Sequence, residues 1–214
     1  MKQKEIALLG KIAAGMTHEL KNVLAIINES AGLVSDICAH SGKDFQHMDK
    51  VERAVGSIQR QIEKGADITT KFNTFAHSMD SESGQVTANE VVEQVVFLMQ
   101  RFAQQKQIEL VSKPMRKDKG FTTRPVRLLL TLCTCVDFYL SGLAGAKRIT
   151  LSPAKSREGI SFDVSIDKAS AREAGGPTAF SELPQMKDTL SCLNADIRPL
   201  KSEGQPGLKL VLFV

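Results

Sequence analysis

The sequence is poor in aromatic residues: its 214 residues include no tryptophan and only one tyrosine. Lysine and arginine are dispersed along the chain, and the formal net charge is only +4. Proteins that bind nucleic acid usually combine a clustered basic surface with aromatic side chains on which bases stack. The composition therefore argues against a nucleic-acid partner.

Long apolar runs and paired cysteines are also lacking. The longest apolar run, residues 126–146, is interrupted by Arg127, Asp137 and small polar residues, and none approaches the ~20 residues of a membrane-spanning helix. The N-terminus enters a charged amphipathic pattern and does not resemble a signal peptide. The four cysteines form no Cys-x-x-Cys pair, which predicts reduced thiols and no metal site. We therefore expect a cytoplasmic protein without membrane insertion.

A heptad pattern of apolar residues fills the first part of the chain. These residues recur at alternating spacings of three and four from Ile6 to Ile37, with Ser30 at the one polar position. Such a seam is typical of an amphipathic helix that packs along its whole length. The pattern predicts a helix over residues 3–39.

A second heptad pattern runs from Val51 to Met79, after a break at Gly42. The two patterns predict an antiparallel helical hairpin that occupies residues 1–80. Two such helices cannot cover their apolar faces with each other alone. We therefore expect a homodimer in which two hairpins form a four-helix bundle.

His18 stands out within the first helix. With Ala13 and Leu20 at a positions, His18 falls at an f position, directly away from the apolar seam. A histidine in this place faces water and can exchange a group with a large partner.

The neighbours of His18 fit the same chemistry. Ala14 and Gly15, one turn earlier, are small and leave the imidazole uncovered. Glu19 supplies an adjacent carboxylate, and Asn22 lies four residues on along the same face. The arrangement favours a nucleophilic histidine.

The stretch from Gly10 to Asn22 resembles the H-box of two-component sensor histidine kinases. The resemblance implies that His18 is phosphorylated on a ring nitrogen. It further implies that Glu19 accepts a hydrogen bond from the other ring nitrogen and acts as a general base. It also implies that Asn22 can position a water molecule to dephosphorylate a partner response regulator. One departure is Val23, where the family usually has a kinking proline.

After a polar linker at residues 80–85, residues 86–214 predict a second domain. The expected elements, in order, are a helix from Thr87, a strand at 108–111, a basic loop at 116–120, a helix at 124–143, strands at 148–152 and 160–166, a flexible connection at 169–178, a helix at 183–193, and strands at 196–200 and 208–214. This order predicts a two-layer α/β sandwich and an α+β protein overall. It is similar to the ATP-binding domain of the same kinases.

The groups that would bind a nucleotide are missing from this domain. In the family, an asparagine-rich helix supplies an amide to the magnesium ion, but here that asparagine is replaced by Phe138, or by Asp137 if the register shifts. Asp167 stands where the adenine-reading aspartate belongs, yet residues 168–171 contain no glycine. Residues 175–177, Gly-Gly-Pro, are typical of an ordinary flexible turn and not of a phosphate-binding loop. We therefore expect no nucleotide and no other cofactor.

Taken together, the sequence predicts a degenerate member of the family that acts as a histidine phosphotransferase. His18 would relay a phosphoryl group between receiver-domain aspartates of response regulators, with Glu19 polarising the imidazole and Asn22 contacting the docked receiver. The residues expected to dock the receiver are Ala14, Gly15, Lys21 and Ala25. Three alternatives stay open: a response-regulator phosphatase, an active kinase with an unorthodox nucleotide site, and a non-enzymatic dimeric adaptor.

Overall fold

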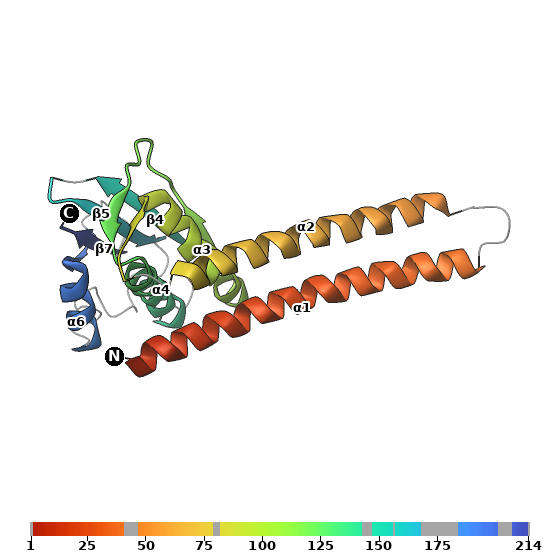
Figure 1. The fold of residues 1–214 in the computed structure, drawn as a ribbon, viewed down its shortest axis with the longest axis horizontal. Coiled ribbons are helices and arrows are strands. Elements are labelled where there is room, and N and C mark those ends of the chain that lie inside the picture. Colours follow the sequence, from red (N-terminus) through yellow and green to blue (C-terminus); the bar gives the residue numbers. More distant parts are fainter. Residues whose placement is uncertain are drawn as a thin grey trace. The chain divides into compact units, whose positions relative to one another are not determined.

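The structure is a computed structural model that describes residues 2–40, 47–78, 82–142, 147–155, 157–167, 184–200 and 207–213 (Figure 1). The chain divides into two compact units. The first consists of Ala13–Thr74, and the second combines Met1–Ile12 with Phe75–Val214.

The helical unit, Ala13–Thr74, contains most of two long antiparallel helices, α1 (Lys2–His40) and α2 (Met48–Ser78) (Figure 1). Both predicted helices are confirmed, whereas the predicted break at Gly42 lies outside the described residues. The helix α1 continues without interruption through Val23, which is 3% exposed. A proline there would have removed a backbone hydrogen bond, and valine keeps it.

The two helices pack through alternate turns of their apolar seams. The buried apolar side chains of this unit are Met16, Val23, Ile37, Ala54 and Ile68. Gly65 of α2 faces α1 closely, because a Cβ atom at that position would lie 3.2 Å from Cγ1 of Val23. A glycine in the seam therefore brings the helices together one turn beyond His18 on α1.

By length and composition alone, one helix of the described chain could also cross a membrane, from Glu5 to His40 in α1. The core helix of a soluble protein passes the same test. The middle of this stretch carries His18, Glu19 and Lys21, which are costly in a bilayer.

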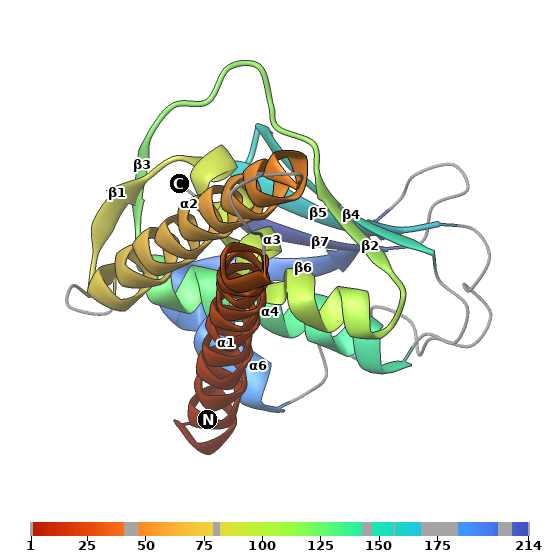
Figure 2. The same ribbon diagram turned by 90° about the vertical axis from the view of Figure 1, so that its right-hand side faces the viewer.

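The second unit is a mixed α/β domain (Figure 2). Its elements are β1 (Gly84–Val86), α3 (Ala88–Gln105), β2 (Glu109–Ser112), β3 (Phe121–Thr123), α4 (Pro125–Gly142), β4 (Arg148–Lys155), β5 (Ile160–Ile166), α6 (Pro184–Leu193), β6 (Ala195–Pro199) and β7 (Gly207–Leu212). Five strands form one sheet in the order β2-β4-β5-β7-β6. Strands β2 and β4 are parallel, and the other neighbours are antiparallel. The predicted two-layer α+β architecture is confirmed.

The core lies between this sheet and helices α3, α4 and α6, which lie on one of its faces (Figure 2). Leu151, Val164 and Leu208 are paired across three neighbouring strands, and each is 1% exposed. On the helical side, Leu98 and Leu128 are fully buried. Burying a leucine contributes about 1.5–3 kcal/mol, so this layer is the main source of the unit's stability.

Helix α3 begins where the sequence predicts. The Thr87 side chain accepts a hydrogen bond from the Glu90 backbone N–H at 3.3 Å, and the Glu90 carboxylate accepts one from the Thr87 backbone N–H at 3.0 Å. This reciprocal capping box satisfies two backbone donors at the helix start and fixes its first turn.

Two short strands were missed by the sequence analysis. Part of the expected linker at residues 80–85 belongs to β1, which pairs with β3 in a separate two-stranded ribbon. Strands of three residues show no measurable alternation, and their pairing partner lies far away in the sequence. The expected flexible connection at 169–178 lies outside the described residues.

Candidate functional site

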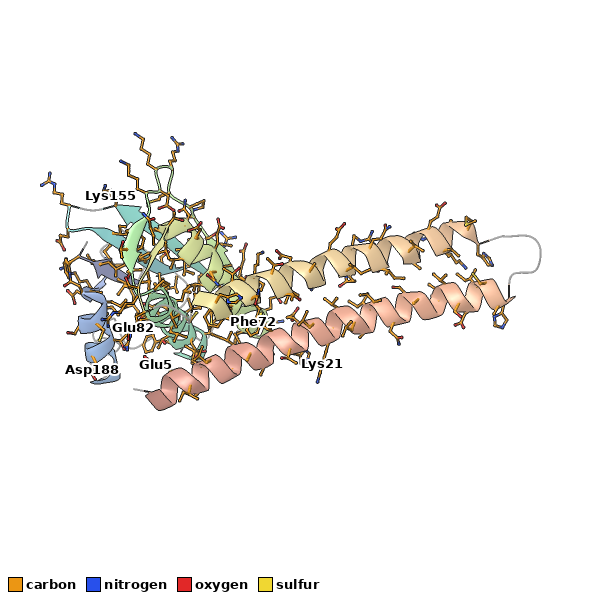
Figure 3. All side chains as sticks on the ribbon, in the orientation of Figure 1. Glu5, Lys21, Phe72, Glu82, Lys155 and Asp188 are labelled. Atoms are coloured by element: carbon orange, nitrogen blue, oxygen red, sulfur yellow. The ribbon has the colours of Figure 1, made fainter. Side chains whose placement is uncertain are left out.

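His18 lies on the exposed surface of α1, as the heptad pattern predicts. Asn22 is also exposed, one turn further along the helix. Of the four residues expected to dock a receiver, Ala14, Lys21 and Ala25 are exposed and Gly15 is buried. Figure 3 shows Lys21 projecting from the side of α1 opposite α2. The helix thus presents a histidine, an amide and an ammonium group to solvent.

Glu19 occupies a different environment from His18, although the two are adjacent in sequence. Its side chain is 23% exposed, and Oε2 lies 3.6 Å from the ammonium nitrogen of Lys64 on α2. Successive residues of a helix point about 100° apart, so Glu19 reaches the side of α1 that faces α2. The carboxylate beside the histidine is therefore held by the facing helix.

Lys64 was missed by the sequence analysis. The available signal is its position directly before Gly65, the small residue in the apolar seam of α2. Because Gly65 allows the helices to approach closely at Val23, the residue before it can reach α1. Which lysine of α2 meets Glu19 depends on helix rotation, which a single sequence does not specify.

In the second unit, helix α4 carries Phe138 and Asp137, which the sequence analysis expects in place of a metal-binding asparagine. The aromatic ring of Phe138 packs edge-on against Tyr139, with ring centroids 5.5 Å apart. The hydroxyl of Thr134, one turn earlier, donates a hydrogen bond to the Leu130 carbonyl at 2.7 Å. An apolar ring and a hydroxyl already bonded to the helix backbone are poor ligands for a magnesium ion.

Asp137, the alternative residue for the metal-binding position, is already paired. Its carboxylate accepts a hydrogen bond from the ammonium group of Lys11, in the part of α1 that belongs to this unit. The same ammonium nitrogen lies 4.8 Å from the centroid of the Phe102 ring. This contact cannot be predicted from the sequence pattern, because Lys11 and Asp137 are 126 residues apart. A protein cation thus neutralises the one carboxylate of α4.

Asp167, which the resemblance predicts to be the adenine-reading aspartate, forms hydrogen bonds to the backbone. Both of its carboxylate oxygens lie near the Lys147 N–H, at 3.1 and 3.2 Å. Its own N–H donates to the Arg148 carbonyl at 3.2 Å. These bonds join the end of β5 to the start of β4.

The residues of this site therefore do not fit a magnesium nucleotide. Phe138 offers no ligand, Asp137 is neutralised by a lysine, and Asp167 caps the entry to a strand. Phosphate groups need preorganised donors or a bound cation to offset their charge.

The rest of α4 is a packed core helix. Cys133 and Cys135 are fully buried free thiols. Burial raises the pKa of Cys135 to about 12, and it raises the pKa of Cys133 further in the same direction. Burial also raises the pKa of the Tyr139 hydroxyl. All three groups are neutral at physiological pH and act as apolar packing.

Comparisons with known proteins bear on the fold. A scan against protein-family models finds no match, and neither does a search of curated proteins. Among solved structures, the nucleotide-free catalytic domain of the histidine kinase ThkA matches with a TM-score of 0.50 at 12% identity, over 62% of this chain and 98% of that one. The Acinetobacter baumannii histidine kinase AdeS matches over 92% of this chain and 97% of that one, at 13% identity and a TM-score of 0.48.

A bacterial phosphotransferase matches over 96% of both chains, at 11% identity and a TM-score of 0.43. At these identities a structural likeness shows the fold alone. Of these three matches, only the ThkA domain reaches a TM-score of 0.50, so the fold assignment rests on it. This chain has a long helix pair followed by a mixed α/β domain like the ATP-binding domain of histidine kinases.

Proposed function

We propose that this chain is a histidine phosphotransferase of two-component signalling. In this proposal, His18 takes a phosphoryl group from an aspartyl phosphate on one receiver domain and passes it to an aspartate on another. The observation that supports the proposal is an asymmetry: His18 is exposed on an intact helix, whereas the residues of the nucleotide site do not fit a nucleotide.

The step balances without a further reactant. A neutral imidazole nitrogen of His18 attacks the phosphorus, the N–P bond forms, and the bond from phosphorus to the aspartyl oxygen breaks. The receiver aspartate leaves as a carboxylate, and the second ring nitrogen keeps its proton. The imidazole becomes cationic, and the carboxylate of the adjacent residue Glu19 would stabilise this charge if it turns toward the ring during transfer. Transfer to the second receiver is the same step in reverse.

Catalysis of this kind consists mostly of positioning. The exposed residues Lys21 and Asn22 would contact the receiver or its phosphoryl group, and the small Ala14 and Ala25 would let it approach the imidazole. Docking of the whole receiver then fixes the in-line geometry.

The proposed active form is a homodimer. In the helical unit, large apolar side chains stay exposed in the single chain: Leu24 (64%), Ile26 (38%), Leu33 (48%), Met48 (47%), Val55 (41%) and Ile62 (56%). Met48, Val55 and Ile62 are spaced by seven residues and form one ridge along α2. A second copy of the hairpin would cover this ridge and complete a four-helix bundle.

We place this protein in the cytoplasm, where receiver domains act in this scheme. Its four cysteines all lie in the described residues and are free thiols. Reduced thiols are typical of the cytoplasm.

Response-regulator phosphatase activity is the second candidate. Asn22 is exposed on the same helix one turn after His18, where its amide could orient a water molecule toward an aspartyl phosphate. This reading needs no phosphorylated His18 and no ATP.

One labelling experiment separates the candidates. The purified chain is incubated with labelled ATP and, separately, with receivers that carry labelled aspartyl phosphate; a His18→Gln variant is the control. The proposal predicts label on the wild-type chain from the receiver and none from ATP. Label from ATP would indicate a kinase. Release of free phosphate without labelled protein would indicate a phosphatase, and no change would indicate an adaptor.

A further inference from the structure

A cluster of exposed cations lies at one end of the five-stranded sheet. Strands β2 and β4 are parallel, and the Lys113 N–H that follows β2 donates to the Leu151 carbonyl of β4 at 2.8 Å. The connection from β2 to β3 and the turn from β4 to β5 therefore leave the sheet at the same end. In Figure 3, Lys155 is labelled on the side from which the β2–β3 loop projects.

We call this cluster the basic rim. Its six side chains are all exposed: Lys113, Arg116, Lys117, Lys119, Lys155 and Arg157. Among the residues that the structure describes, none of the six forms an ion pair. The cations therefore face solvent with their charge uncompensated.

The two acidic residues of these connections, Asp118 and Glu158, bind groups outside the rim. The Asp118 carboxylate accepts hydrogen bonds from the backbone N–H groups of Ala88 and Asn89, at 3.1 and 2.6 Å, at the start of α3. The Glu158 carboxylate lies 2.7 Å from Nη1 of Arg198. A carboxylate at a helix N-terminus offsets the partial positive charge there. Neither acid forms an ion pair with a rim cation among the described residues, and the six cations outnumber these two acids.

The loop that carries most of the rim is held in place. The Asn89 side-chain amide donates to the Met115 carbonyl at 3.1 Å, and its oxygen accepts from the Met115 N–H at 2.9 Å. Together with the Asp118 bonds, these contacts fix the loop backbone to α3 at two points. Because the loop backbone is held in place, the lysines and the arginine leave it at fixed positions. Such an arrangement suits a partner whose anionic groups are also at fixed positions.

We propose that the basic rim docks the acidic face of a folded protein, namely the receiver that exchanges a phosphoryl group with His18. The inference rests on the proposed function for the identity of this partner. A protein that accepts a phosphoryl group on an aspartate presents carboxylate at its surface. Clustered cations raise the association rate of such a partner and align it before contact.

Two other polyanions fit the rim less well. Residues 113–120 and 155–159 contain no aromatic side chain on which a base could stack, which argues against a nucleic acid. Their described residues expose no large apolar side chain that could enter a bilayer. A pinned loop also gives no advantage on a fluid lipid surface, whereas it does against a folded partner.

The test measures association rate constants of the full-length chain with unphosphorylated receiver domains, by stopped flow, at several salt concentrations. The rim variant is Arg116→Glu/Lys117→Glu/Lys119→Glu. Anionic vesicles of phosphatidylserine and phosphatidylcholine and a DNA duplex serve as competing probes. For the receiver that the wild type binds most rapidly, the rim variant should associate roughly tenfold more slowly, with a shallower salt dependence.

The matched control reverses three exposed lysines outside the rim, Lys50→Glu/Lys106→Glu/Lys147→Glu, and so makes the same change in net charge. It should stay within about twofold of the wild type if local charge matters, because surface charges beyond the Debye length of ~8 Å are screened. Equal losses in both variants would overturn the proposal. So would receiver binding that ignores the rim, rim-dependent binding of vesicles or DNA alone, or no binding to any probe.

Receiver binding that depends on the rim, without any label on His18, would support the docking site and overturn the phosphotransferase proposal. Label on His18 with unchanged receiver binding by the rim variant would support the phosphotransferase proposal and overturn the docking site. The two claims therefore fail separately.

Discussion

The carboxylate of Glu19 is paired with the ammonium group of Lys64, at 3.6 Å across the two helices of the hairpin. The acidic residue next to the exposed histidine is therefore positioned by a residue 45 places later in the sequence, on a different helix. The pair is partly exposed, so its contribution to overall stability is small. Its effect on the orientation of one carboxylate is what bears on function.

Lys64→Met is expected to slow phosphoryl transfer through His18 by roughly two- to fivefold, the range that corresponds to an exposed ion pair. The Glu19 carboxylate would lose its ion pair with Lys64, and its orientation would be less restricted. Single-turnover transfer from a phosphorylated receiver measures the effect, and Lys64→Arg should recover most of the rate. In a Glu19→Gln background the Lys64→Met change should have no further effect. Additive losses in the double variant would show that the pair does not act through Glu19.

Leu24→Glu/Ile62→Glu is expected to convert the protein to a folded monomer. Both positions are mostly exposed in the single chain, so the hairpin tolerates the charges, whereas a dimer would have to bury them without partners. Light scattering gives the mass, and circular dichroism checks that the helices persist. The control variant Asn28→Glu/Gln59→Glu places the same charges at exposed polar positions. A dimeric Leu24→Glu/Ile62→Glu variant would contradict the bundle, and so would a monomeric wild type.

Magnesium ATP is expected to give no binding heat with the full-length chain at micromolar concentrations. Asp137 is held by Lys11, Phe138 supplies no ligand, and Asp167 is bonded to the β4 backbone. Calorimetric titration checks this, with an ATP-binding kinase domain as the positive control. Micromolar binding that disappears in Asp167→Asn would place a nucleotide at this site and favour the kinase alternative.

Gly207→Ala is expected to destabilise the protein by about 1–3 kcal/mol, the usual cost of overpacking a core. A Cβ atom there would lie 2.3 Å from the Val164 carbonyl oxygen and 3.0 Å from Cα of Ser165, both backbone atoms of β5. Urea denaturation measures the loss. Gly10→Ala, with no atom within 4 Å of the added Cβ, should instead stabilise α1 by about 0.5–1 kcal/mol. A Gly207→Ala variant as stable as the wild type would contradict the close strand pairing.

The heptad seam was sufficient to predict the helix pair and the exposed face of His18, because side-chain direction along a helix follows from its period alone. Strands β4 and β5 were equally readable from their alternation. Three features could not be read in this way. The pairing of β1 with β3, the Glu19–Lys64 pair and the Lys11–Asp137 pair each depend on how distant segments meet.

In the proposed function, His18 carries a transferable phosphoryl group. The most direct measurement mixes the wild-type chain with a panel of receivers that carry labelled aspartyl phosphate, quenches in alkali, and locates the label by mass spectrometry. We expect an acid-labile phosphoryl group on His18 that a second receiver removes. The label should be absent in His18→Gln and retained in His47→Gln, whose histidine is also exposed. If none of these receivers labels the wild type while the same receivers label another histidine phosphotransferase, the claim is wrong.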